Sequence, residues 1–171
     1  MRNAIACVAV PPSSLVEHSL EPRDYADAFA ITLPSDVNVD IDSIARACVD
    51  MPYWVRALMR VRNAVVRRFG LITALPALEE TADGPIQPGS RVGIFPLLER
   101  TNHELLFGLD DKHLDFRFSL LRRPVSGAEE LVATTLVRYK NFWGRLYFMF
   151  VKPVHKRVIP AMLRSARHKL G

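Results

Sequence analysis

The amino-acid sequence predicts an α+β fold in which a curved antiparallel sheet wraps around one long, kinked C-terminal helix. Three observations carry this prediction. A segment of alternating polarity is followed by two short helical segments. Several alternating segments with tight connections come next, and short connections favour antiparallel neighbours. A long helical pattern then closes the chain, and its apolar stripe can cover one face of the sheet.

The chain has the size and composition of one globular domain. It contains 171 residues, of which 49% are apolar and 24% are charged. No apolar run approaches the ~20 residues of a membrane helix, and two cysteines are too few for a disulfide framework. We expect a single domain over residues 1–171, with an N-terminal arm at 1–23 and a mobile loop at 79–90.

The N-terminal residues are apolar but do not match an export signal. Only six residues precede Cys7, which is too few for a charged region followed by a hydrophobic region. We therefore expect a short strand or a packed arm here, and a cytoplasmic protein in which Cys7 and Cys48 are both reduced.

Local signals mark the first long strand and the first helix. Residues 27–33 alternate in polarity and predict a strand. Either Asp40 or Asp42 then supplies the side-chain oxygen that caps a helix, which continues to about Val49.

A second helix is predicted from Asp50, which caps it, to Phe69, after which Gly70 ends it. At 100° per residue, Arg62 lies in the middle of the apolar stripe of this helix, beside Trp54, Leu58, Val65 and Phe69. A guanidinium cannot remain unpaired in an apolar interior. Arg62 therefore either pairs with a carboxylate or backbone carbonyls of the fold, or reaches a cavity and meets an anionic ligand group.

Further strands with tight turns are predicted in the second half of the chain. The clearest has Leu114, Phe116, Phe118 and Leu120 on one face. The expected strands are 92–99, 104–109, 113–121 and 131–139, with a loop at 123–127.

The closing helix is expected over residues 141–170, with a kink near Pro153, the first of its two internal prolines. The net charge of the chain is +5, and residues 131–171 contain nine Lys or Arg and no acidic residue. This pattern is typical of an amphipathic helix with a solvated basic back. It also fits a helix that lies on an anionic membrane or on a partner protein.

His113, Asp115 and Arg117 share one face of a predicted strand, opposite its apolar side chains. A His-x-Asp pair supplies two metal ligands, which are too few for a site. A hydrogen-bonded or ion-paired ladder is the ordinary outcome of such a pattern. If this face instead lines a cavity, Asp115 orients His113 and the two form an acid/base pair.

Three aromatic side chains near the terminal helix are further candidates. His155 lies on an apolar arc, where a histidine is usually a satisfied core residue. Tyr139 ends the last strand and Tyr147 lies early in the helix, and both can be packed or can offer a hydroxyl to a ligand. The sequence has no phosphate-binding loop, nucleophile elbow or zinc spacing, so we expect no metal or cofactor, and it lacks a nucleic-acid-binding module.

Several motifs resemble one protein family over nearly the whole chain from about residue 8. They are Asp24-Tyr-Ala-Asp-Ala-Phe29, Pro52-Tyr-Trp-Val-Arg-Ala-Leu58 with Arg62-Asn63 and Phe69-Gly-Leu71, Asp110-Asp-Lys-His-Leu-Asp-Phe-Arg117, Gly144-Arg-Leu-Tyr-Phe148 and Val151-Lys-Pro-Val-His155. The chain resembles the DUF2867 family of uncharacterised bacterial proteins. The order of its elements is similar to that of the helix-grip fold of START-domain, polyketide-cyclase and Bet v 1-like proteins. This resemblance implies a cavity for an apolar or amphipathic small molecule, and fold alone does not imply catalysis.

We therefore expect a protein that binds a small apolar or amphipathic molecule between the sheet and the C-terminal helix. The expected polar contacts come from Arg62, His113, Asp115, Tyr147, Tyr139 and His155. One alternative is a cyclase or hydratase, with His113 or His155 as base and Arg62 stabilising an enolate. Another is an interaction module that uses the basic C-terminal helix. The sequence leaves the ligand and the oligomeric state open.

Overall fold

The structure is a computed structural model that describes residues 4–34, 39–49, 53, 57, 85–92 and 95–171. The strands in these residues form one seven-stranded sheet of order β1-β2-β7-β6-β5-β4-β3, in which all neighbours are antiparallel. The expected α+β fold with an antiparallel sheet and a long C-terminal helix is confirmed. The strands are β1 (Ala6–Cys7), β2 (Tyr25–Thr32), β3 (Arg91–Val92), β4 (Phe95–Arg100), β5 (Glu104–Asp110), β6 (Leu114–Val125) and β7 (Ala128–Tyr139).

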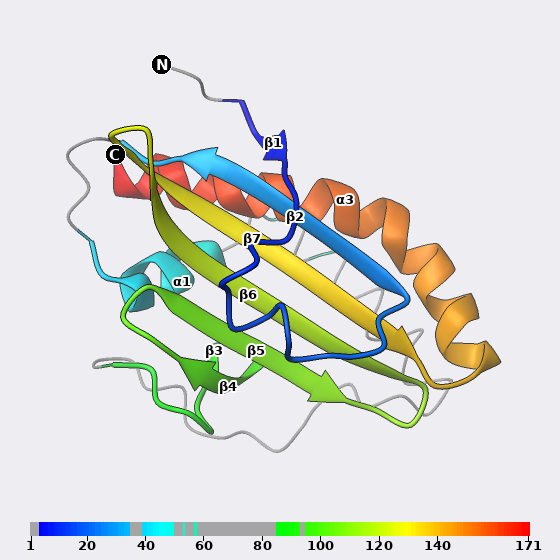
Figure 1. Cartoon of the computed structure of the whole chain (residues 1–171). Coiled ribbons are helices and arrows are strands. Elements are labelled where there is room, and N and C mark those ends of the chain that lie inside the picture. Colours follow the sequence, from blue (N-terminus) through cyan, green and yellow to red (C-terminus); the bar gives the residue numbers. More distant parts are fainter. Residues whose placement is uncertain (1–3, 35–38, 50–52, 54–56, 58–84, 93–94) are drawn as a thin grey trace.

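The helices α1 (Ile41–Val49) and α3 (Phe142–Leu170) cover one face of this sheet (Figure 1). The main core lies between these layers. Ile159, Leu163 and Ala166 of α3 pack with Leu131 and Ala133 of β7 in that core. We call this side of the sheet the helix-facing face, and the other side the outer face.

The outer face is covered by residues 8–22, the segment that precedes β2. Val16 is 0% exposed and Leu20 is 3% exposed, and they pack on Leu106 of β5 and Leu136 of β7. The predicted N-terminal arm is thus a packed layer, and β7 lies between it and α3. Its apolar side chains are sparse, which is why the sequence indicated an arm but not the face of the sheet that the arm covers.

Asp40 caps α1, because its Oδ1 accepts a hydrogen bond of 2.8 Å from the backbone N–H of Ser43. Asp42 has a different role. It faces Arg100 of β4, whose two terminal nitrogens lie 3.2 and 3.0 Å from its carboxylate oxygens. The same carboxylate accepts from the N–H of Ile86, and Arg100 donates to the Ile86 carbonyl. This buried network attaches α1 and the described residues 85–90 to the edge of the sheet.

Two predicted boundaries were wrong. The single strand expected at 92–99 is a pair, because β3 and β4 are antiparallel neighbours. The loop expected at 123–127 is a tight hairpin, because β6 and β7 pair as far as Val125 and Ala128. Ser126 (φ 50°) and Gly127 (φ 80°) both have the positive φ of a two-residue hairpin turn. A turn of this type matches the twist of the two strands, so β6 and β7 stay paired up to the turn and Pro124 lies within the paired region.

The C-terminal helix is confirmed and contains both Pro153 and Pro160. Asn141 caps it by accepting a 3.1 Å hydrogen bond from the N–H of Gly144. Figure 1 shows the ribbon of α3 changing direction along its length, as internal prolines require. Among the described residues, no helix has both the length and the apolarity to cross a membrane. The second predicted helix, which includes Arg62, lies outside the described residues except for Tyr53 and Ala57, and these two are helical. Residues 79–84 of the predicted loop also lie outside the described residues.

We predict that Gly144→Ala destabilises the protein although alanine favours helices. A Cβ at this position would overlap the backbone oxygen of His113, and a backbone atom cannot move aside easily. We expect unfolding in urea to show a loss of about 2 kcal/mol, the size of an overpacking penalty. Ser165→Ala in the same helix is the control and should change little. A Gly144→Ala protein as stable as the parent would contradict the close approach.

Candidate functional site

Two clusters of polar side chains lie toward the end of β7 from which α3 begins. They occupy opposite faces of the sheet. The outer-face cluster consists of Asp115, Arg138 and Lys140. The helix-face cluster consists of Tyr25, Asp27, Thr135 and His155. Neither is a group of three or more His, Cys, Asp or Glu side chains placed to hold a metal ion, and the described part of the chain contains no such group.

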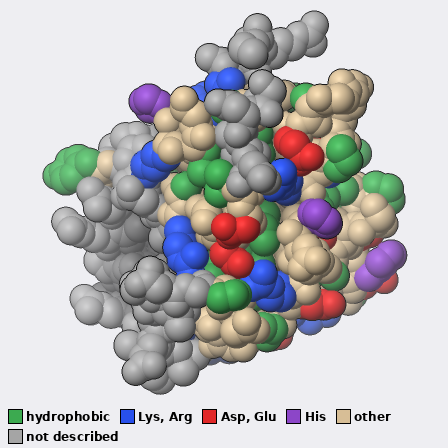
Figure 2. Space-filling model, turned by 90° about the vertical axis from the view of Figure 1, so that its left-hand side faces the viewer, with side chains coloured by type: hydrophobic (Ala, Val, Ile, Leu, Met, Phe, Trp, Pro, Cys, Tyr) green, Lys and Arg blue, Asp and Glu red, His purple; other side chains and the backbone are tan. Residues whose placement is uncertain are grey.

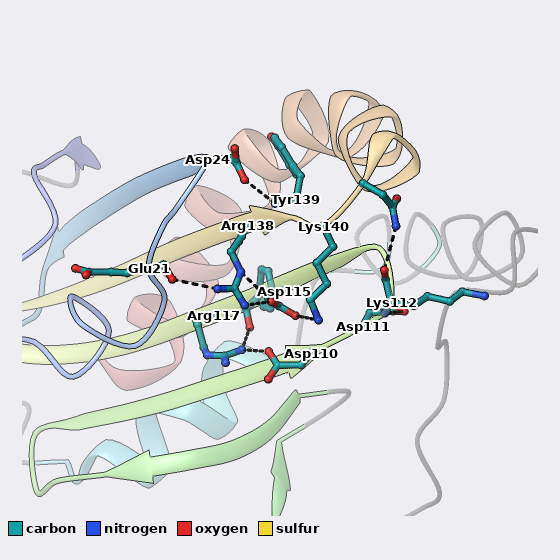
Figure 3. Close-up of polar contacts among 12 residues, drawn as sticks. Glu21, Asp24, Asp110, Asp111, Lys112, Asp115, Arg117, Arg138, Tyr139 and Lys140 are labelled. Atoms are coloured by element: carbon teal, nitrogen blue, oxygen red, sulfur yellow. Dashed lines mark hydrogen bonds and ion pairs between the residues drawn. The ribbon is translucent and has the colours of Figure 1, made fainter.

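The outer-face cluster is a cross-strand ion-pair network (Figure 3). Asp115 of β6 lies directly opposite Arg138 of β7, and the two side chains share the outer face. The Nε of Arg138 lies 3.0 Å from Oδ2 of Asp115, and the Nζ of Lys140 lies 2.6 Å from Oδ1. Arg138 also donates to the carbonyl of Glu21, so the network attaches the N-terminal arm to the sheet. A second pair, Arg117 to Asp110 at 2.6 Å, extends the ladder to β5.

This environment lowers the pKa of Asp115 from its ordinary value. Burial acts to raise this pKa, since the Asp115 side chain is only 1% exposed. The hydrogen bonds and positive charges of Lys140 and Arg138 outweigh that effect. Asp115 is therefore a carboxylate at neutral pH with its charge already compensated, as in the ion-paired ladder that the alternating sequence indicated.

His113 lies at the turn before β6 and not beside Asp115. Its Nδ1 lies 3.1 Å from Oδ1 of Asn141, the residue that caps α3. The backbone oxygen of His113 accepts from the N–H of Lys140. His113 thus links the β5–β6 turn to the start of α3, and the structure shows no hydrogen bond between it and the carboxylate of Asp115 among the described contacts.

The helix-face cluster joins β2 to α3. Tyr25 and Asp27 are two apart on β2 and point to the same side, and the hydroxyl of Tyr25 donates a short hydrogen bond to Oδ2 of Asp27. The other oxygen of Asp27 lies 3.3 Å from Nε2 of His155. Asp27 and His155 are 8% and 10% exposed, so a hydroxyl, a carboxylate and an imidazole are held together between the two layers.

Aromatic rings and one more hydroxyl surround this cluster. The ring of Tyr25 lies 4.8 Å from that of Phe148, and Tyr139 lies 5.7 Å from Phe148. Burial raises the pKa of Tyr25, and the hydrogen bond to Asp27 raises it further, so its hydroxyl stays protonated. Thr135 lies opposite Asp27 in the sheet register; its Oγ1 is buried and has no hydrogen-bond partner among the described residues.

The structure thus separates the residues that the sequence singled out. His155 and Tyr139 lie on the helix-facing side, where the ring of His155 is near that of Tyr25 and the ring of Tyr139 is near that of Phe148. Asp115 lies on the outer face, and His113 lies at a turn. Tyr147 is partly buried on α3, and Arg62 lies outside the described residues.

Sequence reasoning missed three members of the helix-face cluster, Tyr25, Asp27 and Thr135. A weak signal exists for the first two. They are polar residues on the same side of β2 as Phe29 and Ile31. If the two apolar residues are buried, the polar side chains on that face of the strand are buried as well and need hydrogen-bond partners. Thr135 gives no such signal, because threonine is common in strands.

A buried hydroxyl–carboxylate–imidazole chain can bind polar atoms and can transfer protons. Asp27 holds one nitrogen of His155, and such a contact orients an imidazole for acid–base chemistry. Tyr25 supplies a hydroxyl that is bonded to Asp27, and Thr135 supplies another from the neighbouring strand. The outer-face cluster has no comparable capacity, because both oxygens of Asp115 are already paired with cations.

The fold and the clusters define an α+β protein with a two-layered centre and polar groups between its layers. A family model described as "Protein of unknown function (DUF2867)" matches residues 19–162. The chain belongs to the DUF2867 family, as its motifs indicated. A search of curated proteins finds no match.

We predict that Asp115→Asn lowers the free energy of unfolding by about 2 kcal/mol at pH 7. Removing one partner of a buried pair costs about 3–5 kcal/mol, and the partial exposure of Arg138 and Lys140 reduces this. Because folding lowers the pKa of Asp115, its contribution is present above the ordinary carboxyl pKa and is lost as pH falls through the lowered value. The difference in the free energy of unfolding between parent and variant should therefore begin to shrink near pH 4 and decrease further at lower pH.

Asp110→Asn is the matched control for this measurement. Asp110 is 60% exposed and forms a single ion pair with Arg117. We expect its loss to cost about 0.5 kcal/mol. Equal effects of the two substitutions in urea melts at pH 7 would show that burial of Asp115 does not strengthen its pairing.

Proposed function

We propose that this protein is a helix-grip binding protein that holds a small apolar or amphipathic molecule between the sheet and α3. The order of elements supports this, because one antiparallel sheet precedes a long terminal helix that covers it. Ligand sites commonly lie between such layers and combine apolar walls with a few polar groups.

The helix-face cluster is the proposed polar end of the site, and one observation carries this. Thr135 has a fully buried hydroxyl without a hydrogen-bond partner among the described residues, beside the paired groups of Asp27. A buried unsatisfied polar group costs about 1–3 kcal/mol. A polar atom of a bound molecule would remove this cost, and Tyr25 and His155 provide further contacts.

The proposed apolar end is formed by phenylalanines on the same face of the sheet. Phe95 of β4 stacks on Phe116 at 5.4 Å, and Phe107 lies 6.2 Å from Phe118. These rings belong to strands β4 to β6, whereas the polar groups lie on β2, β7 and α3. A molecule with a polar head and an apolar body matches this gradient.

The Asp27–His155 pair favours a second function, that of a cyclase or hydratase with the same site. In that case His155 is the base, since Asp27 already orients it, whereas His113 is bonded to Asn141. Arg62 remains the proposed enolate-stabilising group. Incubation of a recovered ligand with fresh protein separates the two functions, because a binding protein returns it unchanged and an enzyme converts it.

We predict that Thr135→Val weakens ligand binding without loss of stability. Valine has the shape of threonine but no hydroxyl, so the substitution should remove an unsatisfied group and stabilise the fold by about 1 kcal/mol. Fluorescence titration with cis-parinaric acid, an amphipathic probe, should show about tenfold weaker binding, which is the loss of one hydrogen bond at ~1.4 kcal/mol. Native mass spectrometry of the parent should also show a co-purifying molecule.

Thr134→Val is the matched control for this substitution. Thr134 is equally buried and without a partner among the described residues, but it lies on the outer face opposite Ser119. It should gain similar stability and keep the affinity of the parent for the probe. His155→Gln should weaken binding and His113→Gln should not. Equal affinities in all four variants would refute the site.

A further inference from the structure

We propose that the outward face of α3 docks on a membrane surface that contains anionic lipids. Four large apolar side chains in its first nine residues are exposed instead of packed: Phe142 (69%), Trp143 (55%), Met149 (58%) and Phe150 (68%). An ordinary surface helix places polar residues on its solvent side. This inference does not depend on the proposed ligand site, because it concerns the opposite side of the helix.

The exposed side chains form one surface and are not scattered. At 100° per residue, Phe142, Met149, Phe150 and Trp143 fall within an arc of about 120°. The buried residues of α3, such as Phe148, Ile159 and Ala166, fall on the other side of the helix. Figure 1 shows the first turns of α3 at the end of the sheet, away from the C-terminus.

The charge on α3 itself is of one sign. α3 contains seven Lys or Arg and no Asp or Glu. Lys156, Arg157 and Arg164 are exposed on the outward arc and form no ion pair with a described acidic residue. The aromatic turns are thus followed along the same arc by cationic turns.

The far end of the molecule has a different surface. Figure 2 shows acidic and basic side chains next to one another at the end that carries the β6–β7 hairpin. Arg122 pairs there with Glu129 at 2.9 Å and Arg123 with Glu130 at 2.7 Å. The cations of the hairpin are therefore compensated by neighbouring acidic side chains, whereas Lys156, Arg157 and Arg164 of α3 are not paired with any described acidic residue.

An anionic lipid surface fits these observations better than a second copy of the chain. Two copies meeting through α3 would bring cations against cations, which opposes association. Aromatic side chains favour the interface between lipid headgroups and acyl chains, and each Lys or Arg near an anionic surface adds about fivefold to binding. The helix supplies both, in the arrangement of an interfacial amphipathic helix.

The test is cosedimentation of the full chain with vesicles. We expect binding to vesicles of phosphatidylcholine with 30% phosphatidylglycerol, falling steeply as NaCl rises, and little binding to phosphatidylcholine alone. Lys156→Gln with Arg157→Gln should weaken binding about 25-fold, from two charges at about fivefold each. Phe142→Ser with Phe150→Ser should abolish binding at the same lipid concentration. Circular dichroism checks that each variant is folded.

Two matched variants control for a change of charge or of exposed apolar surface elsewhere. Arg122→Gln with Arg123→Gln removes two cations from the far hairpin, and Leu98→Ser removes an apolar side chain that is 44% exposed on β4. Both should bind vesicles like the parent. The proposal is overturned if the folded parent binds neither vesicle or both equally, or if the controls lose binding as strongly as the α3 variants. Binding to polyglutamate without binding to vesicles would also overturn it, in favour of an acidic protein partner.

Discussion

Burial of β7 on both faces is the constraint on which the rest of the structure depends. Residues 131–137 of this strand are all buried, because α3 covers one face and the N-terminal arm covers the other. Apolar area removed from water stabilises the fold by about 25 cal/mol per Å². A polar group in the same place is costly unless it is hydrogen-bonded. Each polar side chain beside β7 therefore needs a partner, and the two polar clusters are different responses to that need.

The outer-face cluster is complete within the chain, whereas the helix-face cluster is not. Asp115 has a cation at each oxygen, and its partners also attach the arm through Glu21. In the helix-face cluster, Tyr25, Asp27 and His155 are paired, but the hydroxyl of Thr135 has no partner among the described residues. A closed network stabilises a fold, and an open one has capacity for another molecule. Thr134 on the outer face is equally unpartnered among the described residues, so it is the position of Thr135 opposite Asp27, which is itself paired with His155, that places the proposed ligand site on the helix-facing side and not at Asp115.

Local patterns predicted those parts of the fold that local physics determines. The alternation of Phe116 and Phe118 with Asp115 indicated the two faces of β6. The two aspartates at 40 and 42 indicated the start of α1, and the structure shows that Asp40 is the cap. The proline at 124 indicated a loop, but pairing along two twelve-residue strands outweighed its missing N–H. The N-terminal arm was predicted, but its packing on β5 and β7 was not, because its few apolar residues have no regular spacing.

The candidate site was harder to predict, because its members come from distant parts of the chain. Asp27 and His155 are 128 residues apart, and no local pattern records such a contact. His155 was identifiable as a polar residue on an apolar arc, but its partner was not. Asp115 and Arg138 illustrate the opposite case. Their pairing follows from the register of two adjacent strands, and this register can be deduced from the sequence once the hairpin turn at Ser126 and Gly127 is known.

The composition of α3 also exceeds what folding requires. A helix covers its core only where the sheet lies beneath it, and before Val158 only Gly144 and Phe148 are buried. The aromatic side chains at 142, 143 and 150 therefore contribute little to the core, and their exposure has a cost in water. A soluble helix would be at least as stable with polar residues there. The buried side of α3 accounts for the fold, so the exposed apolar and basic side chains need a separate explanation. Docking on a membrane surface that is both apolar and anionic provides one.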